Sequence, residues 1–271
     1  MIIRVLVIAG SDSGGGAGIQ ADIKTIAAFG GFATTAITAI TVQNTLGVHN
    51  IFPVPANIIV AQIKAVLDDI GADAIKIGML GDAETIIAIS QTLKQYPDIP
   101  VILDPVMRAK GGASLLNIKA QNSLIERLIP LATLITPNIP EAESLLGEDI
   151  NATNMANSAI KLQQLGAKNV LLKGGHLESD DLVDVLYYGN ENHSHKNHGS
   201  EIFHYPTTRL HTRNTHGTGC TMASAITALV AQGEKLPQAV EKAQFYVRGA
   251  IINAPNFGKG HGALWHGWQM N

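Results

Sequence analysis

The segment His216-Gly217-Thr218-Gly219-Cys220 continues directly into the apolar stretch TMASAITALVAQG at residues 221–233. Two glycines bracket the turn, a helix is predicted to begin there, and the only cysteine of the chain falls on its first turn. Backbone N–H groups at such a helix start converge on an anion, so the segment suits a phosphate or a developing oxyanion. Taken alone, the pattern is as typical of a tight turn without a ligand.

A second glycine-dense segment, Gly10 to Gly18, follows an apolar run near the N-terminus and precedes another predicted helix. It lacks the lysine of a G-x-x-x-x-G-K-[ST] phosphate loop and is therefore not predicted to be one. We interpret Gly14, Gly15 and Gly16 as a place where the backbone closely approaches a small flat ligand. Two glycine-rich turns of this kind indicate an enzyme that holds two ligands.

Apolar runs of strand length alternate with segments of helical period, as in the predicted helix over 57–70. This alternation predicts an α/β fold of three layers, with a mostly parallel central sheet and helices on both faces. Ligands of such folds bind beyond the carboxyl ends of the strands, so the segments that follow strands should line one rim. The predicted strands are 3–9, 32–42, 74–77, 101–103, 133–135 and 169–172.

Two further short strands, 182–188 and 201–204, are predicted to form an antiparallel hairpin at the edge of the sheet. His193, His195 and His198 lie in its polar tip, which we interpret as a solvated turn rather than a metal site. No linker divides the chain, and we expect one domain over 1–271. The glycine-rich tail over 257–268 either folds over a nucleotide or anchors the terminus, and the sequence leaves this open.

Composition excludes several classes of protein. The 271 residues are 46% hydrophobic and 15% charged with a formal net charge of −3, and no run of about 18 apolar residues predicts a membrane span. The acidic pI of about 6.3 argues against a nucleic-acid partner. The N-terminus is interpreted as a strand rather than a signal peptide, and a single cysteine indicates a cytoplasmic location.

The chain resembles the hydroxymethylpyrimidine/phosphomethylpyrimidine kinases of thiamine biosynthesis, which belong to the ribokinase-like superfamily. The resemblance extends over nearly the whole chain and is carried by seven motifs in the family's order. These are GSDSGGGAGIQAD at 10–22, TAITVQNT at 38–45, KIGML at 76–80, LDPVM at 103–107, TPNIPEAE at 136–143, KGGH at 173–176 and NTHGTGC at 214–220.

The resemblance implies phosphorylation of 4-amino-5-hydroxymethyl-2-methylpyrimidine by ATP to the monophosphate and then to the diphosphate, with Mg²⁺ as the metal. Glu141 and Asp104 are implied to hold the Mg²⁺ shell. The superfamily suggests a homodimer acting on a small-molecule substrate, and a requirement for a monovalent cation is left open. The remaining implied positions are Gln43, Asp22, Gly10, Met79 and Val106 for the pyrimidine, Asn138, Lys173, Thr218 and Gly219 for ATP, and Cys220, Gly217, Gly219 and Lys173 for phosphoryl transfer.

Physical chemistry supports these roles but keeps structural alternatives open. The Gln43 amide suits the ring nitrogen and amine of an aminopyrimidine, although it equally suits a solvated strand end. Asp104 before a proline is also a common turn, and Asn138 with Glu141 also forms a helix capping box. Met79 and Val106 either sandwich the ring or belong to the core.

Cys220 carries the sharpest chemical hypothesis. A helix N-terminus is expected to lower the pKa of its thiol and favour the thiolate, although a lone cysteine is more often a small buried apolar residue. Sugar kinases of the superfamily have aspartate at this position. A thiol, unlike a fixed carboxylate, does not repel the phosphate that serves as acceptor in the second phosphorylation.

Two other functions compete with this interpretation. Pyridoxal kinases share the superfamily and phosphorylate another hydroxymethyl heteroaromatic compound. A non-catalytic sensor of pyrimidines or nucleotides is the second rival, but such a sensor has no need for Lys173, Glu141, Asp104 and Cys220 together.

Overall fold

The computed structural model describes residues 1–107, 116–189 and 200–269. Within these residues, strands form a nine-stranded sheet in the order β3-β2-β1-β4-β5-β6-β7-β8-β9. The strands are β1 Arg4–Asp12, β2 Phe32–Asn44, β3 Gly47–Pro53, β4 Ala74–Ile77, β5 Val101–Leu103, β6 Leu134–Ile135, β7 Asn169–Leu172, β8 Asp181–Gly189 and β9 Ser200–Thr208.

The central six strands, from β2 to β7, pair in parallel, which confirms the predicted sheet. The β8–β9 hairpin is also confirmed and pairs antiparallel with the β7 edge. The strand β3 was not predicted. Most of its residues are exposed, so it lacks the alternating pattern of a half-buried strand, and its pairing with β2 through a tight turn at Thr45 and Leu46 places it in the sheet.

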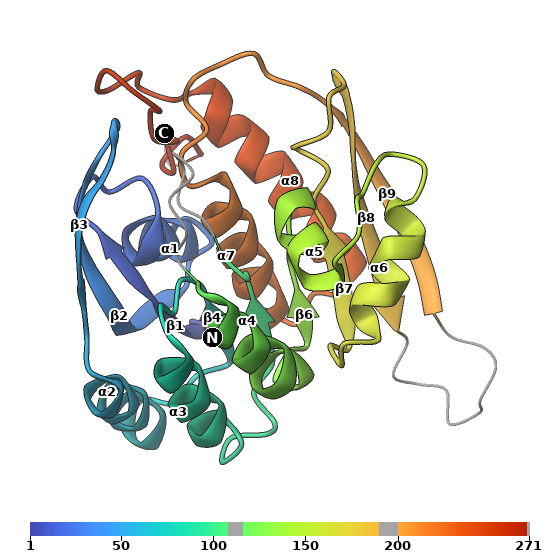
Figure 1. Ribbon diagram of the computed structural model, residues 1–271. Helices are drawn as coiled ribbons and strands as arrows, with labels where there is room; N and C mark the ends of the chain where they lie inside the picture. The colour runs from blue at the N-terminus through green and yellow to red at the C-terminus, as the bar shows by residue number, and fades with distance from the viewer. Residues whose placement is uncertain (108–115, 190–199, 270–271) are drawn as a thin grey trace.

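Helices cover both faces of the sheet (Figure 1). One face carries α1 Gly18–Ala28, α7 Thr218–Ala231 and α8 Leu236–Ile252, and the other carries α2 Ala56–Asp69, α3 Ala83–Leu93, α4 Ile118–Ser123, α5 Ile139–Leu146 and α6 Met155–Gln163. A π-helical turn, Leu124–Leu128, and a 3-10 turn, Ile129–Leu131, continue α4. The expected three-layer arrangement is therefore confirmed.

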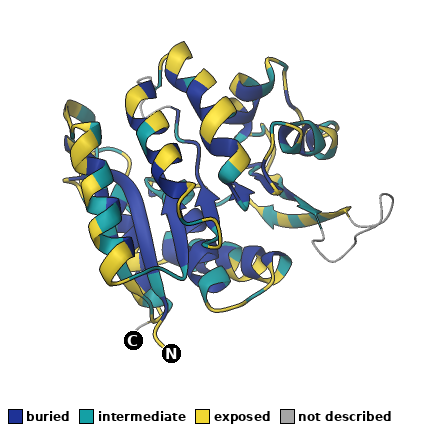
Figure 2. Cartoon of the chain, turned by 90° about the horizontal axis from the view of Figure 1, so that it is seen from below, coloured by how far each residue is buried: buried dark blue, intermediate teal, exposed yellow. Residues whose placement is uncertain are grey.

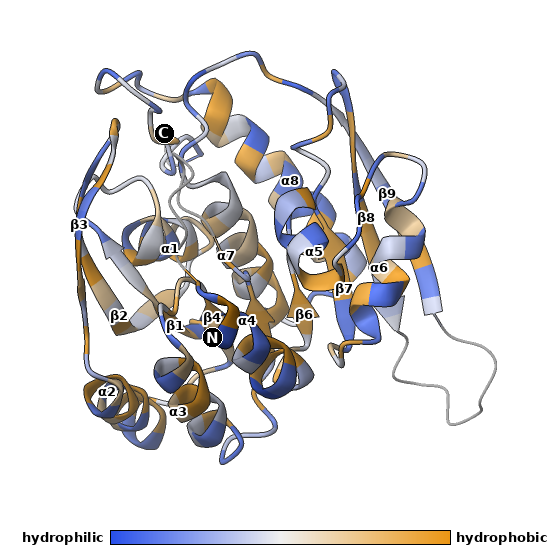
Figure 3. Ribbon diagram, viewed as in Figure 1, coloured by the Kyte–Doolittle hydropathy of each residue, from blue (hydrophilic) through white to orange (hydrophobic). Residues whose placement is uncertain are grey.

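Strand alternation explains how one sheet supplies two cores. In β1, Leu6 and Ile8 belong to the core beneath α2 and α3, whereas Val5 and Val7 belong to the core beneath α1. Successive side chains of a strand point to opposite faces, so a strand covered on both sides is apolar throughout. Figure 2 shows the resulting buried strands between exposed helix surfaces, and Figure 3 shows hydrophobic residues on the helix faces turned to the sheet.

The helix α7 is buried from Thr221 to Leu229, as its uniformly apolar sequence predicts. It begins at Gly217, whose φ of +88° is readily adopted only by glycine. A Cβ at Gly217 would lie 1.8 Å from the carbonyl oxygen of Gly16. The two glycine-rich segments, at opposite ends of the sequence, therefore meet where α7 starts.

The C-terminal tail is anchored to the body of the protein. The backbone N–H of His261 donates to the Thr45 carbonyl, 2.8 Å away, and Tyr246 donates its hydroxyl proton to the His266 carbonyl at 2.6 Å. His193, His195 and His198 lie outside the described residues. In the part of the chain that is described, no helix combines the length and the apolar character needed to cross a bilayer.

Candidate active site

A cavity of about 550 Å³ opens at the carboxyl ends of the parallel strands. The predicted rim is confirmed, since the end of β2 and the segments that follow β1, β4, β5, β6 and β7 all contribute to its wall. The predicted site residues that line it are Gly10, Gln43, Met79, Asp104, Val106, Asn138, Glu141, Lys173, Gly217, Thr218, Gly219 and Cys220.

One part of the cavity wall is built around the pair of Lys173 and Asp104. The Lys173 ammonium lies 2.8 Å from Asp104 Oδ1, which also accepts a hydrogen bond of 3.0 Å from the Thr136 hydroxyl. Burial opposes ionisation of Asp104, but the attraction of Lys173 and Lys76 outweighs it and lowers the pKa of the carboxyl group. Burial likewise disfavours the Lys173 cation, but Asp104 and Glu141 raise its pKa. Both groups are therefore charged at neutral pH.

The N-terminus of α7 lies beside this pair. A Cβ at Gly219 would lie 3.3 Å from Lys173 Nζ and 3.5 Å from Asp104 Oδ2. No side chain caps the helix at Gly217, so the first-turn amides keep their capacity to bind a ligand. A lysine and an uncapped helix start on one wall form a cradle that suits a phosphoryl group.

The structure corrects the expectation for Cys220. Burial raises the pKa of its thiol to about 11; Lys76 opposes the rise, while Asp22 and Asp104 add to it. The prediction that the helix start would favour the thiolate is therefore wrong for the ligand-free protein. Desolvation, together with the carboxylates of Asp22 and Asp104, outweighs the lowering effect of Lys76 on this pKa, and the cavity presents a neutral thiol at pH 7.

Asn138 and Glu141 form the expected capping box at the start of α5. The Asn138 side chain accepts from the Glu141 backbone N–H at 2.9 Å, and Glu141 Oε2 accepts from the Asn138 N–H at the same distance. Burial raises the pKa of Glu141 to about 7, with Lys173 opposing and Asp104 adding to the shift. Both residues also line the cavity, so the cap and the site share the same side chains.

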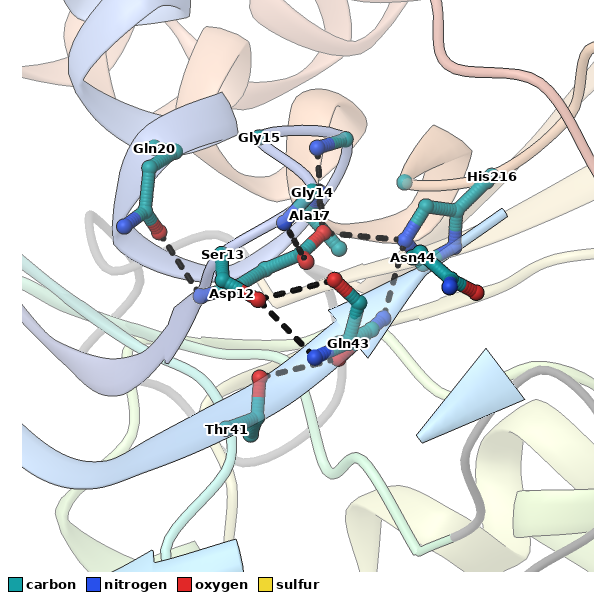
Figure 4. A network of polar contacts seen from close by, with 12 residues as sticks. Asp12, Ser13, Gly14, Gly15, Ala17, Gln20, Thr41, Gln43, Asn44 and His216 are labelled. Carbon is teal, nitrogen blue, oxygen red and sulfur yellow. Dashed lines mark hydrogen bonds and ion pairs between the residues drawn. The ribbon is translucent and has the colours of Figure 1, made fainter. Parts of the chain in front are cut away.

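The cavity wall also holds Gln43 in a polar network with Asp12 and His216 (Figure 4). Asp12 Oδ1 accepts from the Gly14 N–H at 2.7 Å, and Oδ2 accepts from the N–H groups of Gly16 at 3.0 Å and Ala17 at 2.8 Å. The interpretation of Gly14, Gly15 and Gly16 as a ligand contact is therefore wrong. The glycines wrap a carboxylate of their own chain, while Ala17 and Gly18 face the cavity.

Asp22 also departs from its predicted place. Its side chain is fully buried behind the cavity wall, where it pairs with Lys76 at 2.9 Å and accepts a 2.7 Å hydrogen bond from Ser224. Lys76, by contrast, lines the cavity. Burial disfavours the Lys76 cation, but Asp22, Cys220 and Asp104 raise its pKa. Asp22 thus acts as the counter-ion of a buried lysine rather than as a wall residue.

Sequence reasoning missed several residues of the site. Lys76, Asp12 and His216 stand inside the quoted motifs, but no role was assigned to them. A lysine in the middle of an otherwise apolar strand is a detectable signal, because such a charge needs a buried partner. His176, from the segment after β7, and His261, from the C-terminal tail, also line the cavity. The sequence left open whether this tail would fold over a ligand or anchor the terminus.

The known proteins that this chain resembles in sequence are mainly kinases of one family. The phosphomethylpyrimidine kinase family model matches residues 12–265. The hydroxymethylpyrimidine/phosphomethylpyrimidine kinase of Haemophilus influenzae is 47% identical over 97% of this chain and 96% of its own length. The thiamine biosynthesis bifunctional protein ThiED of Geobacter sulfurreducens is 49% identical over 97% of this chain, and the match spans about half (52%) of that longer relative.

Solved structures share the fold. The crystal structure of a phosphomethylpyrimidine kinase from Clostridium difficile has a TM-score of 0.79 and 43% identity, covering 92% of this chain and 99% of its own. The ADP complex of Bacillus subtilis pyridoxal kinase has a TM-score of 0.89 and 35% identity, covering 100% and 99%. The ribokinase-like fold expected from the sequence is thereby confirmed.

The raised pKa of Cys220 predicts slow alkylation. At pH 7.5 we expect iodoacetamide to react on the order of 100-fold more slowly with the folded protein than with a free thiol, because so little thiolate is present. Since the thiolate fraction rises with pH up to the pKa, the rate should increase roughly tenfold per pH unit between pH 7.5 and 9.5. Mass spectrometry of the single cysteine measures it.

The same chain unfolded in urea is the matched control, and its cysteine should react like a free thiol. A rate for the folded protein that levels off by about pH 8 would contradict the raised pKa.

The buried Lys76–Asp22 pair predicts a large effect of removing one partner. Asp22→Asn should lower the free energy of unfolding by about 3–5 kcal/mol, because it leaves a buried ammonium without its counter-ion. Adding Lys76→Met should recover part of this loss, since both charges are then gone. Urea denaturation of the single and double variants measures the coupling, and strictly additive losses would refute it.

Proposed function

The chain belongs to the phosphomethylpyrimidine kinase family, and we propose that it transfers the γ-phosphoryl group of ATP to 4-amino-5-hydroxymethyl-2-methylpyrimidine and then to the monophosphate, in thiamine biosynthesis. The observation that carries the proposal is the shared cavity. Lys173, Asp104 and the α7 N-terminus lie on its wall together with Gln43, Met79 and Val106. In the proposed complex, a heteroaromatic alcohol held by Gln43 directs its hydroxyl toward Lys173 and the helix start.

The residues around Lys173 and the helix start suit phosphoryl transfer, which asks a protein mainly to position groups and offset charge. In the proposed reaction, the Gly219 and Cys220 amides donate hydrogen bonds to the transferring oxygens, and Lys173 offsets their charge. Thr218 and Asn138 contact the nucleotide. Because Cys220 is neutral, it admits both the alcohol and the negatively charged monophosphate.

We propose Mg²⁺ as the metal of the reaction. In the described residues, no group of three or more His, Cys, Asp or Glu side chains is arranged to hold a metal ion. Asp104 and Glu141 fit Mg²⁺ nonetheless, because this ion is commonly held by one or two carboxylates together with water and substrate phosphates. Bound there, it would offset charge on the polyphosphate. The proposal includes a requirement for a monovalent cation, which is tested by leaving that cation out of the assay.

The setting of the enzyme is also proposed. We place it in the cytoplasm as a homodimer, with residues 1–271 as one kinase domain. The continuous sheet supports the single domain, the single cysteine supports the cytoplasm, and the dimer rests on the superfamily resemblance alone. The structural likeness to pyridoxal kinases makes pyridoxal the competing substrate. Gln43 favours the aminopyrimidine, because its amide pairs with the ring nitrogen and amine together.

The proposed function predicts two products in sequence. With Mg²⁺ and ATP, mass spectrometry should show the pyrimidine monophosphate first and the diphosphate later, with pyridoxal turned over at a lower kcat/KM. Faster turnover of pyridoxal would favour the competing function. Absence of ADP release above background with either substrate would favour a binding protein instead.

Replacing Cys220 by Asp should separate the two steps. Asp104 and Glu141 already lie on this cavity, so a further fixed carboxylate would repel the monophosphate more than the neutral alcohol. We expect kcat/KM of the second step to fall on the order of tenfold more than that of the first. Cys220→Ser, which adds no charge, is the control, and equal losses in both steps for Cys220→Asp would count against this role.

A further inference from the structure

The amide of Gln43 lies between two groups that compete for its orientation (Figure 4). Its nitrogen Nε2 is 3.1 Å from His216 Nε2, and its oxygen Oε1 is 3.2 Å from the Thr41 hydroxyl oxygen. Exchanging the oxygen and nitrogen by a half-turn of the amide leaves the shape unchanged but reverses every donor and acceptor. The protons of its neighbours therefore decide which orientation is stable.

His216 Nε2 must carry a hydrogen. It lies 3.0 Å from Asp12 Oδ2, and hydrogen bonds from the Gly14, Gly16 and Ala17 amides show that Asp12 is an acceptor. Burial opposes its ionisation, but His216 and these amides lower its pKa. A ring nitrogen facing a carboxylate at this distance donates to it, and a nitrogen that donates has no lone pair for the Gln43 amide nitrogen.

The Thr41 hydroxyl leads to the same conclusion from the other side. Its single proton is used in a 2.8 Å hydrogen bond to the Ser11 carbonyl. What it offers to Gln43 at 3.2 Å is therefore a lone pair, which cannot pair with the amide oxygen. With Nε2 toward Thr41, the amide N–H meets the Thr41 lone pair. With Oε1 toward His216, an acceptor replaces a donor beside the Nε2–H, which Asp12 and Gln43 then share in a three-centre hydrogen bond.

We propose that Asp12 and His216 are positioning residues that fix the Gln43 amide with Oε1 toward His216 and Nε2 toward Thr41, and thereby determine which heteroaromatic edge the cavity accepts. The inference rests on the proposed function for its substrate class. Neither residue needs to touch the reacting atoms, since they act through the amide.

A fixed amide discriminates between rings by the order of their donor and acceptor. Gln43 keeps one oxygen lone pair and one N–H for a ligand, and it lines the cavity. A 4-aminopyrimidine offers an N–H donor beside a ring acceptor, whereas its 4-oxo analogue offers an acceptor beside a ring N–H. Because the hydroxymethyl group neighbours this edge, a ring that turns over to restore the pairing carries its hydroxyl away from Cys220.

His216 is well placed for this task. A Cβ at Gly16 would lie 2.4 Å from its Cδ2 atom, so the imidazole packs directly on the backbone of the glycine loop. Its own backbone N–H donates to the Gly262 carbonyl at 3.1 Å. The ring therefore packs against the glycine loop while the backbone that carries it is fixed to the tail, and the hydrogen bond to Asp12 sets its N–H direction before a substrate enters.

The test compares the two pyrimidines in wild type and His216→Phe, which keeps a ring but removes the N–H. Calorimetric affinities and kcat/KM are both measured. In wild type, kcat/KM for the 4-amino compound should exceed that for the 4-oxo compound on the order of 100-fold or more. The 4-oxo ring presents donor and acceptor in the reverse order, which leaves buried polar groups unpaired. In His216→Phe this ratio should fall roughly tenfold or more, because the Gln43 amide can then turn to pair with either ring.

Ser13→Ala is the matched control. Ser13 exchanges hydrogen bonds of 2.8 Å with the Gln43 backbone and leaves both partners of the amide in place, so the preference should persist. Retention of the wild-type preference by a folded His216→Phe variant would overturn the inference.

A second measurement needs no substrate. Nitrogen-15 NMR of the ligand-free wild type should show His216 with a hydrogen on Nε2, and an unprotonated Nε2 would overturn the inference whatever the variant does. If wild type neither binds nor phosphorylates either ring, the proposed function fails, while the NMR result still decides the orientation of the amide.

Discussion

The pairing of buried charges beneath the carboxyl edge of the sheet is the constraint on which the site depends. Lys76 and Asp22 have no exposed side-chain surface, and an unpaired charge at such a depth costs several kcal/mol. Asp22 is on α1, Lys76 is on β4 and Ser224, which donates to Asp22, is on α7. The ion pair and this hydrogen bond together tie α1 and α7 to β4, the strand that carries Lys76.

The same pairing sets the electrical state of the cavity. Lys173 is held against Asp104 and Lys76 against Asp22, so neither lysine contributes an uncompensated positive charge. Glu141, with a pKa of about 7, is about half ionised at pH 7, whereas the Cys220 thiol is neutral, so the two together add only a partial negative charge. Such a cavity tolerates an acceptor that is neutral in one reaction and negatively charged in the next, which a site with a fixed surplus of either sign would not.

Sequence reasoning succeeded where a local sequence pattern is enough to determine the structure. Apolar runs such as those of β1 and β4 predicted the parallel strands, and the rule that ligands gather at carboxyl ends brought Gln43, Asp104 and Lys173 to one rim. It failed where the deciding partner is distant in the sequence. Asp22 meets Lys76 only in the folded sheet. The miss of β3 has a different cause, because its partner β2 is adjacent in the chain but its exposed residues give no alternating pattern.

The error about Cys220 has the same physical origin as that about Asp22. A helix start is visible in the sequence, but the desolvation and the carboxylates that raise the pKa come from other elements. The glycines show the reverse situation, in which sequence identified the residues and structure supplied the reason. Gly16 leaves room for the His216 ring and Gly217 for the Gly16 carbonyl. A side chain at either position would separate the two turns, and with them Gln43 from the helix start that receives the phosphoryl group.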